Sequence, residues 1–535
     1  MTVRKLAVLA ICAVAGFGLG ACQTGGTIAP AADSGLAAVV KTDAGYVSGI
    51  NGAIRSYKGI PYAAPPVGEL RWKAAQPVAA WEGIKEAKTF GPGCLQGRAA
   101  NPQFAEDCLT LNVWTPAKAA GAKLPVYVWI HGGAYESGAG TLPVYDGGAL
   151  ASEGIVVVTI NYRLGILGWF SHPELSAESP DHVSGNQGVT DMIQSLKWVQ
   201  VNIAAFGGDP GNVTIGGESA GGTSMGLLMI SPKAKGLFQK AVAESPWGFL
   251  QPTGHLKQTW YGKKPAEDVG AAVGKLSDLR AKTALEAMAL PRGTGAGATS
   301  HQVVDGVIIP DDPTTLLQKG QINPIKLIVG TNRDEGTIFS RPAATLKDAE
   351  TAANTAVGPG GDKLVAIYGA TSDAAAQDAN LGISRDSLFT LGGRQLARTT
   401  DMNSDAWQYE FTRVSGAGKR SKLGAFHGAE MPYFFRNLPN VPYVAARVGA
   451  MKTDDFNATD EKLSLGMSGY LLNFIKNGDP NGPGLTPWPK FEASPAAGGE
   501  KYMEFGSDGF TVKSDLRKAQ LDPMQQLFQG QYDKR

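Results

Sequence analysis

Short, continuous apolar runs recur through the middle of the chain and constrain its fold more than any other feature. They are rich in β-branched residues and stand at residues 125–130, 155–160, 213–215, 240–244 and 325–330. Uninterrupted apolar strands of this kind are typical of a sheet that is buried on both faces. Between two of them, residues 186–208 carry apolar side chains at helical spacing, which predicts a helix that crosses back over the sheet. This alternation predicts the α/β class, with a large, mostly parallel sheet flanked by helices.

Length and composition favour one large catalytic domain. The chain has 535 residues, 43% of them hydrophobic, and no clean linker divides residues 38–535. Within that domain, alanine-rich helical segments at 255–300 and 341–400 are expected to form a cap over the site. An amphipathic stripe from Leu463 to Phe474 predicts another helix near the C-terminus. Because 49 Lys and Arg residues balance 48 Asp and Glu residues, the charge argues against nucleic acid as a partner.

The first 22 residues resemble a secretory signal. An Arg-Lys pair precedes an apolar stretch from Leu6 to Ala21 that is short for a membrane span. The stretch ends in "LGAC", which resembles a bacterial lipobox whose cysteine, Cys22, is acylated and begins the mature protein. A plain signal peptide cleaved nearby, with Cys22 incidental, is the alternative. We expect an exported protein, periplasmic or anchored to the outer membrane through Cys22, with residues 23–37 as a flexible tether.

Two of the four cysteines lie beyond this leader, at Cys94 and Cys108. An exported chain meets an oxidising compartment, so we expect these two cysteines to form a disulfide. Two lone cysteines are a poor metal site, and we expect neither a metal nor an organic cofactor.

The sequence "TIGGESAGGTS" places Ser219 between glycines at the end of an apolar run. In a chain with 70 glycines the pattern Gly-x-Ser-x-Gly can occur by chance, so its surroundings decide its meaning. A strand leads into it and a helix-compatible segment follows, as in a strained strand-turn-helix that exposes a nucleophile. Gly217 and Gly221 are expected to be glycine because a Cβ at either position would collide with neighbouring backbone.

A nucleophilic serine needs a base and an acid, which follow it along the chain in this type of fold. Of the six histidines, only His427 lies far enough beyond Ser219. The acid should follow a strand between the two, and "IKLIVGTNRDEG" supplies Asp334 and Glu335 there. Spacing alone does not choose between these two carboxylates. A structural histidine and ordinary loop carboxylates are the alternative interpretation.

Donors for an oxyanion should come from a glycine turn after an earlier strand and from the amide that follows the nucleophile. The segment "WIHGGAYESG" supplies Gly132 and Gly133, and Ala220 follows Ser219.

These segments together resemble the type-B carboxylesterases, the α/β-hydrolase family that includes the cholinesterases. The similarity covers about residues 38–510 and rests on ordered blocks such as "YKGIPYAAPPVGELRW", "EDCLTLNVWTP", "NYRLGILGWF", "GTNRDEG", "FHGAEMPYFF" and "NFIKNGDPNGPG". The resemblance implies the α/β-hydrolase fold, a triad of Ser219, Glu335 and His427, and the disulfide between Cys94 and Cys108.

Departures from the family pattern bear on the substrate. Ala134 replaces the third residue of the usual glycine triplet, a variant associated with a roomy oxyanion loop. Gly216 replaces a phenylalanine, and we expect it to open the pocket beside the nucleophile. Tyr135, Trp247 and Phe426 are further positional candidates for the pocket walls. The loop between the two cysteines has no tryptophan, so the platform that binds choline is missing and choline esters are poor candidates.

The resulting hypothesis is a serine hydrolase that cleaves moderately bulky carboxylic esters of small molecules through an acyl-enzyme. An amidase or peptidase with the same triad is one alternative. A binding protein that has lost catalysis is another, although every member of the triad is present.

Overall fold

The structure is a computed structural model, and it describes residues 38–97, 101–247, 261–291, 302–438, 440, 452, 455–494 and 498–533. The expected signal (1–22) and tether (23–37) lie outside these residues, as do parts of the first predicted cap segment. Residues from Gly35 to Arg535 belong to one compact unit. Within the described ranges, no helix combines the length and the apolar content that a membrane crossing requires.

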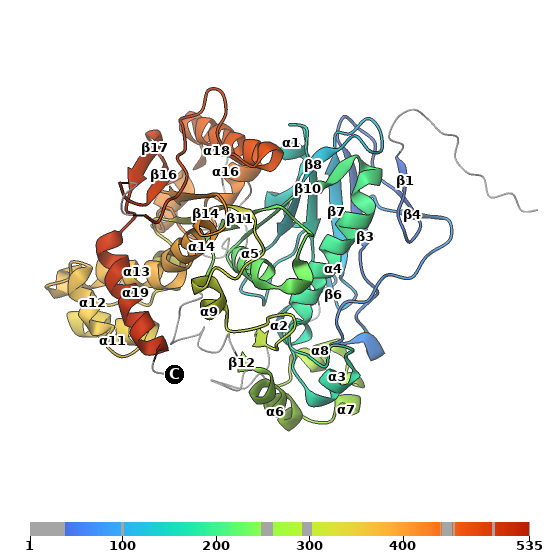
Figure 1. Cartoon of the computed structure of the whole chain (residues 1–535), viewed down its shortest axis with the longest axis horizontal. Helices are drawn as coiled ribbons and strands as arrows, with labels where there is room; N and C mark the ends of the chain where they lie inside the picture. Colours follow the sequence, from blue (N-terminus) through green and yellow to red (C-terminus); the bar gives the residue numbers. More distant parts are fainter. Residues whose placement is uncertain are drawn as a thin grey trace, which may run out of the picture. The chain divides into compact units, whose positions relative to one another are not determined.

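A ten-stranded sheet forms the centre of the unit (Figure 1). Its strand order is β17-β16-β15-β14-β11-β10-β8-β9-β7-β3. The strands are β3 (Arg55–Pro61), β7 (Thr110–Thr115), β8 (Leu124–Ile130), β9 (Val156–Ile160), β10 (Gly208–Glu218), β11 (Lys240–Glu244), β14 (Lys326–Asn332), β15 (Ala406–Phe411), β16 (Lys501–Gly506) and β17 (Gly509–Ser514).

The strands from β16 across to β9 pair in parallel, whereas the pairs β17–β16, β9–β7 and β7–β3 are antiparallel. The mostly parallel sheet is therefore confirmed. All five apolar runs singled out in the sequence fall in its strands, namely β8, β9, β10, β11 and β14. In a parallel sheet the carboxyl ends of neighbouring strands meet at one edge, where α/β enzymes place their sites.

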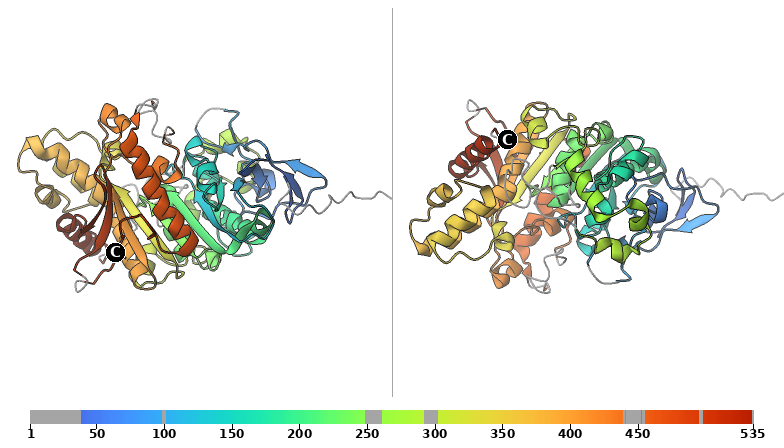
Figure 2. Two further views of the ribbon diagram at one scale, coloured as in Figure 1. Left: turned by 90° about the horizontal axis from the view of Figure 1, so that it is seen from above. Right: turned by 90° about the horizontal axis from the view of Figure 1, so that it is seen from below.

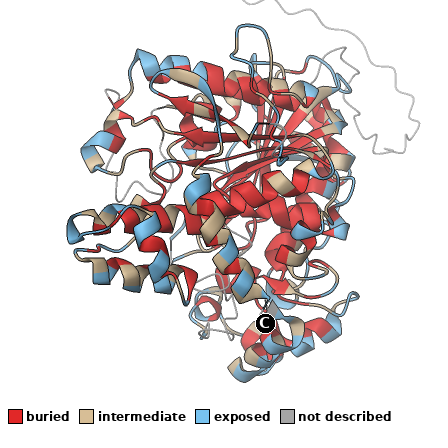
Figure 3. Ribbon diagram, turned by 60° about the vertical axis from the view of Figure 1, so that its left-hand side comes forward, coloured by how far each residue is buried: buried red, intermediate tan, exposed pale blue. Residues whose placement is uncertain are grey.

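Helices cover both faces of the sheet, as Figure 2 shows in two views. One face packs against α4 (Gln187–Asn202), α5 (Ala220–Ile230), α9 (Pro313–Gln318) and α14 (Leu391–Asp401). The other face packs against α16 (Met431–Phe435) and α18 (Ala458–Asn477). Helix α4 is the crossing helix that its apolar spacing predicts, and α18 carries the predicted C-terminal stripe. Strands β9 and β11 and helix α5 are buried throughout, and Figure 3 shows the buried centre of the molecule.

Residues 341–400 are largely helical, as predicted. They form α11 (Leu346–Val357), α12 (Asp362–Ile367), α13 (Ala376–Arg385), a π-helical turn (Asp386–Thr390) and α14. The first three helices share a small apolar core with α19 (Lys518–Tyr532), the C-terminal helix of the described chain. The earlier excursion contributes α6 (Lys263–Val273), α7 (Leu276–Arg280) and α8 (Ala284–Met288).

Cys94 and Cys108 are joined by a disulfide, which confirms the pairing expected from the sequence. Both cysteines are buried, in the apolar cluster that also contains the β8 side chains Val126, Val128 and Ile130.

Candidate active site

Ser219 occupies the sharp turn between β10 and α5. Its backbone is strained, with φ of 58° and ψ of −119°. A Cβ on Gly217 would lie 2.6 Å from the Ile130 carbonyl oxygen, and one on Gly221 would lie 2.1 Å from the same oxygen. Both positions therefore require glycine, as the sequence predicts, because the turn is pressed against the end of β8.

His427 lies in the loop between α15 (Gly416–Ser421) and α16, and its imidazole is held by Glu335. Glu335 Oε2 lies 2.5 Å from His427 Nδ1, and both side chains are buried. The other carboxylate oxygen of Glu335 accepts hydrogen bonds from the Ser245 hydroxyl at 2.5 Å and from the backbone N–H of Asn332 at 2.8 Å. These three donors fix the carboxylate behind the ring.

Asp334 has a different role from its neighbour. Its carboxylate pairs with Arg333 and accepts the Ala425 N–H at 2.7 Å. Asp334 therefore fastens the loop that carries His427, while Glu335 contacts the imidazole itself. The structure chooses between two carboxylates that spacing left equivalent.

The Nε2 side of His427 faces the carboxyl end of β10. Nε2 lies 3.1 Å from Glu218 Oε1, and Glu218 directly precedes Ser219. Within the described chain, the Ser219 hydroxyl makes no hydrogen bond to His427. Hydrogen bonds of this kind are often long in an enzyme without substrate and tighten in the substrate complex.

The glycine turn after β8 lies against Ser219. A Cβ on Gly132 would fall 3.0 Å from Ser219 Cβ and 2.6 Å from the Glu218 carbonyl oxygen. Gly133 has φ of +106°, a conformation that favours glycine. Ala220 begins α5, whose first N–H groups have no partner within the helix. The glycine turn and the start of α5 thus both lie beside Ser219.

Two aromatic rings pack on the His427 imidazole. The ring of Phe389, from the π-helical turn, lies 4.5 Å from it between centroids. The ring of Phe339, at the end of α10 (Gly336–Phe339), lies 5.1 Å away and meets it edge-on. Phe339 is 42% exposed, so it presents an apolar surface beside the histidine.

The charges around His427 favour its protonated form. Burial lowers its pKa, but the carboxylates of Glu218 and Glu335 outweigh burial and raise the pKa of His427 to about 9. Another buried glutamate, Glu430, accepts a hydrogen bond from the Asn332 side chain. Burial and the charges of Glu218 and Glu335 raise the pKa of Glu430 to about 8.

The predicted pocket residues divide into two groups. Ala134 is exposed next to the glycine turn, and Tyr135 packs edge-on against the partly buried Trp247, with ring centroids 6.3 Å apart. These three lie around the turn and the start of α5, where Trp247 donates its N–H to Thr223.

Gly216 and Phe426 do not have the role expected of them. A Cβ on Gly216 would lie 2.2 Å from the Tyr127 hydroxyl, so the space that the missing side chain leaves is filled by Tyr127 rather than open to substrate. Phe426 is 1% exposed and packs in a small cluster with Ala417. The expectation for Gly216 was wrong because its neighbour on the adjacent strand β8, not the elbow, determines the space.

Sequence reasoning missed six residues of the site: Glu218, Ser245, Asn332, Phe339, Phe389 and Glu430. Ser245 reaches Glu335 from the end of β11, the strand beside β14, a relation that only the sheet order reveals. Asn332 donates its backbone N–H to Glu335 three residues further on, a local contact that its side chain does not signal. Glu218 was readable as the nucleophile's neighbour, but nothing local indicates that it faces His427. In the described part of the chain, no group of three His, Cys, Asp or Glu side chains is placed to hold a metal ion.

The mostly parallel sheet carries a serine at a strained strand-helix turn, a glycine turn beside that serine and a buried histidine–glutamate pair. Together these features define a serine hydrolase of the α/β-hydrolase fold. Residues 37–524 match the Carboxylesterase family. The chain is 37% identical to the fumonisin B1 esterase of Sphingopyxis macrogoltabida, with 87% of this chain and 86% of that protein covered. It is 34% identical to the para-nitrobenzyl esterase of Bacillus subtilis, over 85% and 92% of the two chains.

Solved structures agree. A carboxylesterase of Geobacillus stearothermophilus superposes with a TM-score of 0.75 at 32% identity, over 90% of this chain and 99% of that one. The chain therefore belongs to the carboxylesterase family, and it is a carboxylic ester hydrolase.

Proposed function

We propose that Ser219, His427 and Glu335 carry out this hydrolysis through an acyl-enzyme. The supporting observation is the buried contact of 2.5 Å between Glu335 and His427, with Nε2 on the side of Ser219. His427 removes the Ser219 proton, and the oxygen attacks the ester carbonyl. His427 then protonates the leaving alcohol and activates the water that releases the acid. Glu335 holds the imidazole in the tautomer with its proton on Nδ1.

Gly132, Gly133 and Ala220 are the proposed oxyanion donors. Their N–H groups would stabilise the charge that develops on the carbonyl oxygen, an effect worth about 3 kcal/mol for each donor in serine hydrolases. The positive end of α5 adds to this stabilisation because Ser219 stands at its N-terminus.

The experiment is covalent labelling with an organophosphate. One equivalent should attach to Ser219 in the folded protein and none to the Ser219→Ala variant. Ser224→Ala is a matched control, since Ser224 lies one turn along α5 and donates its hydroxyl to the Ala220 carbonyl. Labelling of Ser224, or no labelling of the folded wild-type protein, contradicts the assignment.

For the substrate, we propose moderately bulky esters of small molecules. The support is the exposed Ala134 beside the glycine turn and the exposed apolar ring of Phe339 beside His427. A library that varies the acyl and alcohol parts separately, with matched anilides, tests this. The expected result is turnover of esters with aromatic or branched alcohols and slow cleavage of anilides; a preference for anilides or for methyl and ethyl esters contradicts it.

We also propose that residues 1–22 export the protein and that acylated Cys22 anchors it to a membrane. The support is the Arg-Lys pair, the short apolar stretch and the "LGAC" end. Residues 23–37 would then separate the hydrolase from the membrane surface, in the periplasm or at the outer membrane.

A further inference from the structure

A carboxyl group that the proposed mechanism does not use lies behind the active site. Glu244 ends β11, where its backbone carbonyl accepts the Ser219 N–H at 2.9 Å. It is paired in register with Glu218 on the adjacent parallel strand β10. Paired residues of a parallel ladder point to the same face and stand about 4.8 Å apart across the strands. Two buried carboxyl groups are therefore side by side, and one of them contacts His427.

Two glycines in neighbouring strands make room for tyrosines beside Glu244. A Cβ on Gly330, the register partner of Glu244 on β14, would lie 2.3 Å from the Tyr409 ring. The space above Gly216 on β10 is taken by Tyr127 in the same way. Any side chain at either glycine would displace one of these tyrosines from its place beside Glu244.

Glu244 and the two tyrosines beside it, Tyr127 and Tyr409, have no hydrogen-bond partners for their side-chain oxygens in the described part of the protein. Both carboxyl oxygens of Glu244 and the hydroxyls of Tyr127 and Tyr409 are buried without a hydrogen bond to the chain. The titratable side chains that face Glu244 are Glu218 from β10, Tyr127 from β8, Tyr145 from the 3-10 turn Pro143–Tyr145, Tyr409 from β15 and Glu430 at the start of α16. None of them is a cation.

Glu244 differs in this respect from the other buried glutamates. Glu335 accepts three hydrogen bonds, and Glu218 lies 3.1 Å from His427. Glu430 accepts a hydrogen bond from the side-chain amide of Asn332. An ionised carboxylate with no donor and no cation in a dry interior is costly, and a second charge beside it adds repulsion. Burial, and then the charges of Glu430 and Glu218, raise the pKa of Glu244 well above its usual range.

We propose that Glu244 is a buried proton-binding site: a neutral carboxylic acid at working pH, beside Glu218, the carboxyl group that lies against His427 Nε2. Its O–H serves as a hydrogen-bond donor toward Glu218 and Glu430, directly or through bound water. Because Glu244 carries no charge, the imidazolium is stabilised only by the carboxylates that touch it. The proton of Glu244 thus limits the basicity of the catalytic histidine.

Infrared spectroscopy tests this proton without reference to catalysis, so its outcome is independent of the proposed triad. A protonated buried carboxyl gives a carbonyl stretch that shifts in D2O. We expect this band in the wild-type protein at neutral pH, and at full intensity in the matched control Glu218→Gln. In Glu244→Gln the band should lose the part that Glu244 contributes and keep the part from buried Glu430, whose pKa is raised to about 8. A wild-type spectrum without the band overturns the proposal and needs no variant; a band that persists at full intensity in Glu244→Gln also overturns it.

Stability gives a second readout, with a defined sign. A neutral Glu244 in the folded state and an ionised one in the unfolded state make the wild-type protein lose stability as pH rises above the unfolded pKa, about 4.3. The Tm of Glu244→Gln relative to wild type should therefore increase from pH 4 to neutral pH. A relative Tm that falls over this range shows a stabilised carboxylate and contradicts the proposal.

Kinetics then separates the two adjacent carboxyls. Replacing an ionised group near His427 lowers the pKa seen in kcat/KM by about 1 unit, whereas replacing a neutral one moves it much less. We expect the large shift in Glu218→Gln and the small one in Glu244→Gln. Equal shifts in the two variants would mean that Glu244 is ionised.

Discussion

Asp334 and Glu335 are adjacent in the chain, but their carboxylates contact different groups. Glu335 contacts His427 and accepts bonds from Ser245 and Asn332, whereas Asp334 pairs with Arg333 and holds Ala425. The backbone therefore supplies one acid to the imidazole and uses the other to fix the loop that carries it.

Glu335→Gln should lower kcat by about 10⁴-fold, because an amide at this place can stabilise the wrong imidazole tautomer and no longer balances the imidazolium. Asp334→Asn keeps the same backbone and should lose far less, since its partner is a partly exposed arginine. Steady-state kinetics on a p-nitrophenyl ester, with circular dichroism as the folding control, measures both. The reverse ranking would transfer the role of triad acid to Asp334.

The pH dependence of the enzyme should follow the charge of Glu218. His427 must be neutral to accept the Ser219 proton, so kcat/KM rises with pH through its raised pKa, about 9. Glu218→Gln removes a negative charge 3.1 Å from Nε2, destabilises the imidazolium and lowers that pKa. The rising limb of the profile should move to lower pH in Glu218→Gln and stay in place in Glu174→Gln, an exposed glutamate of α3 (Pro173–Glu178). An unmoved limb in Glu218→Gln would show that its charge does not reach the base.

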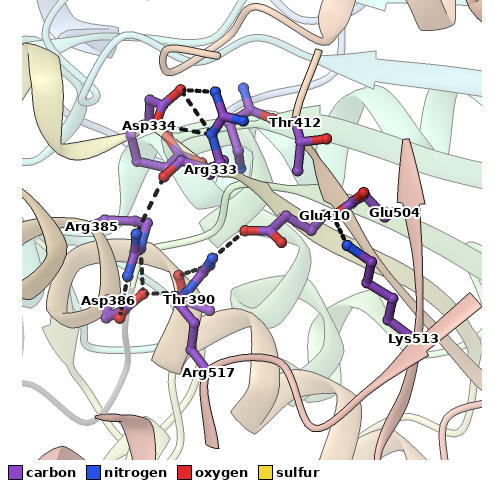
Figure 4. Close-up of polar contacts among 12 residues, drawn as sticks. Arg333, Asp334, Arg385, Asp386, Thr390, Glu410, Thr412, Glu504, Lys513 and Arg517 are labelled. Carbon is purple, nitrogen blue, oxygen red and sulfur yellow. Dashed lines mark hydrogen bonds and ion pairs between the residues drawn. The ribbon is translucent and has the colours of Figure 1, made fainter. Parts of the chain in front are cut away.

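At the scale of elements, the π-helical turn is bound to the C-terminal part of the chain through Arg517, which contacts Asp386 and Thr390 (Figure 4). Asp386 begins the turn and is buried, with Arg385 at 2.7 Å and Arg517 at 3.1 Å. Arg517 also pairs with Glu410 of β15 and donates to Thr390, the last residue of the turn, at 3.2 Å. π-Helical turns are rare and occur often at functional sites. This one carries Phe389, whose ring packs on His427.

Arg517→Met should therefore affect both stability and catalysis. It leaves Asp386 and Glu410 buried without one of their cations, a loss of about 3–5 kcal/mol. It also frees the turn that places Phe389, so kcat of the folded variant should fall. Lys513→Met, which breaks the more exposed pair with Glu504 drawn in the same figure, should change the free energy of unfolding by under about 1 kcal/mol. Urea unfolding and kcat measured below the transition test this; equal effects of the two substitutions would contradict the role of Arg517.

The same elements show how far the sequence predicts this fold. The inner strands were predictable because burial on both faces makes their middle residues apolar, as in "VVVTI" of β9. Strand β15, "AWQYEF", was not, because the buried Glu410 breaks its apolar pattern and is compensated only by Arg517, far away in the sequence. The π-helical turn has no signal of its own, since it continues the helical pattern of its neighbours.

In the candidate site, too, local features could be predicted from the sequence, whereas contacts between distant segments could not. Ser219, His427 and the glycine turn could be found from chain order and local backbone needs. The partner Ser245 could not, because its contact with Glu335 depends on which strands are neighbours. Gly216 was misjudged for that reason too: the Tyr127 ring that fills its place comes from β8, the strand beside it in the sheet.

At the scale of the whole molecule, the described hydrolase has a formal charge close to balance, +1 over the full chain, which gives it no strong electrostatic attraction to an anionic membrane. Its own helices offer no crossing segment within the described ranges. The membrane anchor proposed above is acylated Cys22, which lies outside the described residues.

Cys22→Ser should shift the enzyme from the membrane fraction to the soluble fraction. Each buried methylene of an acyl chain contributes about 0.8 kcal/mol, so several chains hold a protein firmly and their loss releases it. Cys12→Ser is the matched control, since Cys12 lies in the same apolar stretch but not at the "LGAC" end. Fractionation followed by an esterase assay measures both variants. Turnover per molecule should be the same in the two, because all the proposed catalytic residues lie beyond residue 130. If Cys22→Ser remains in the membrane fraction as Cys12→Ser does, the anchor lies elsewhere, and Cys22 is then an incidental residue of a plain signal peptide.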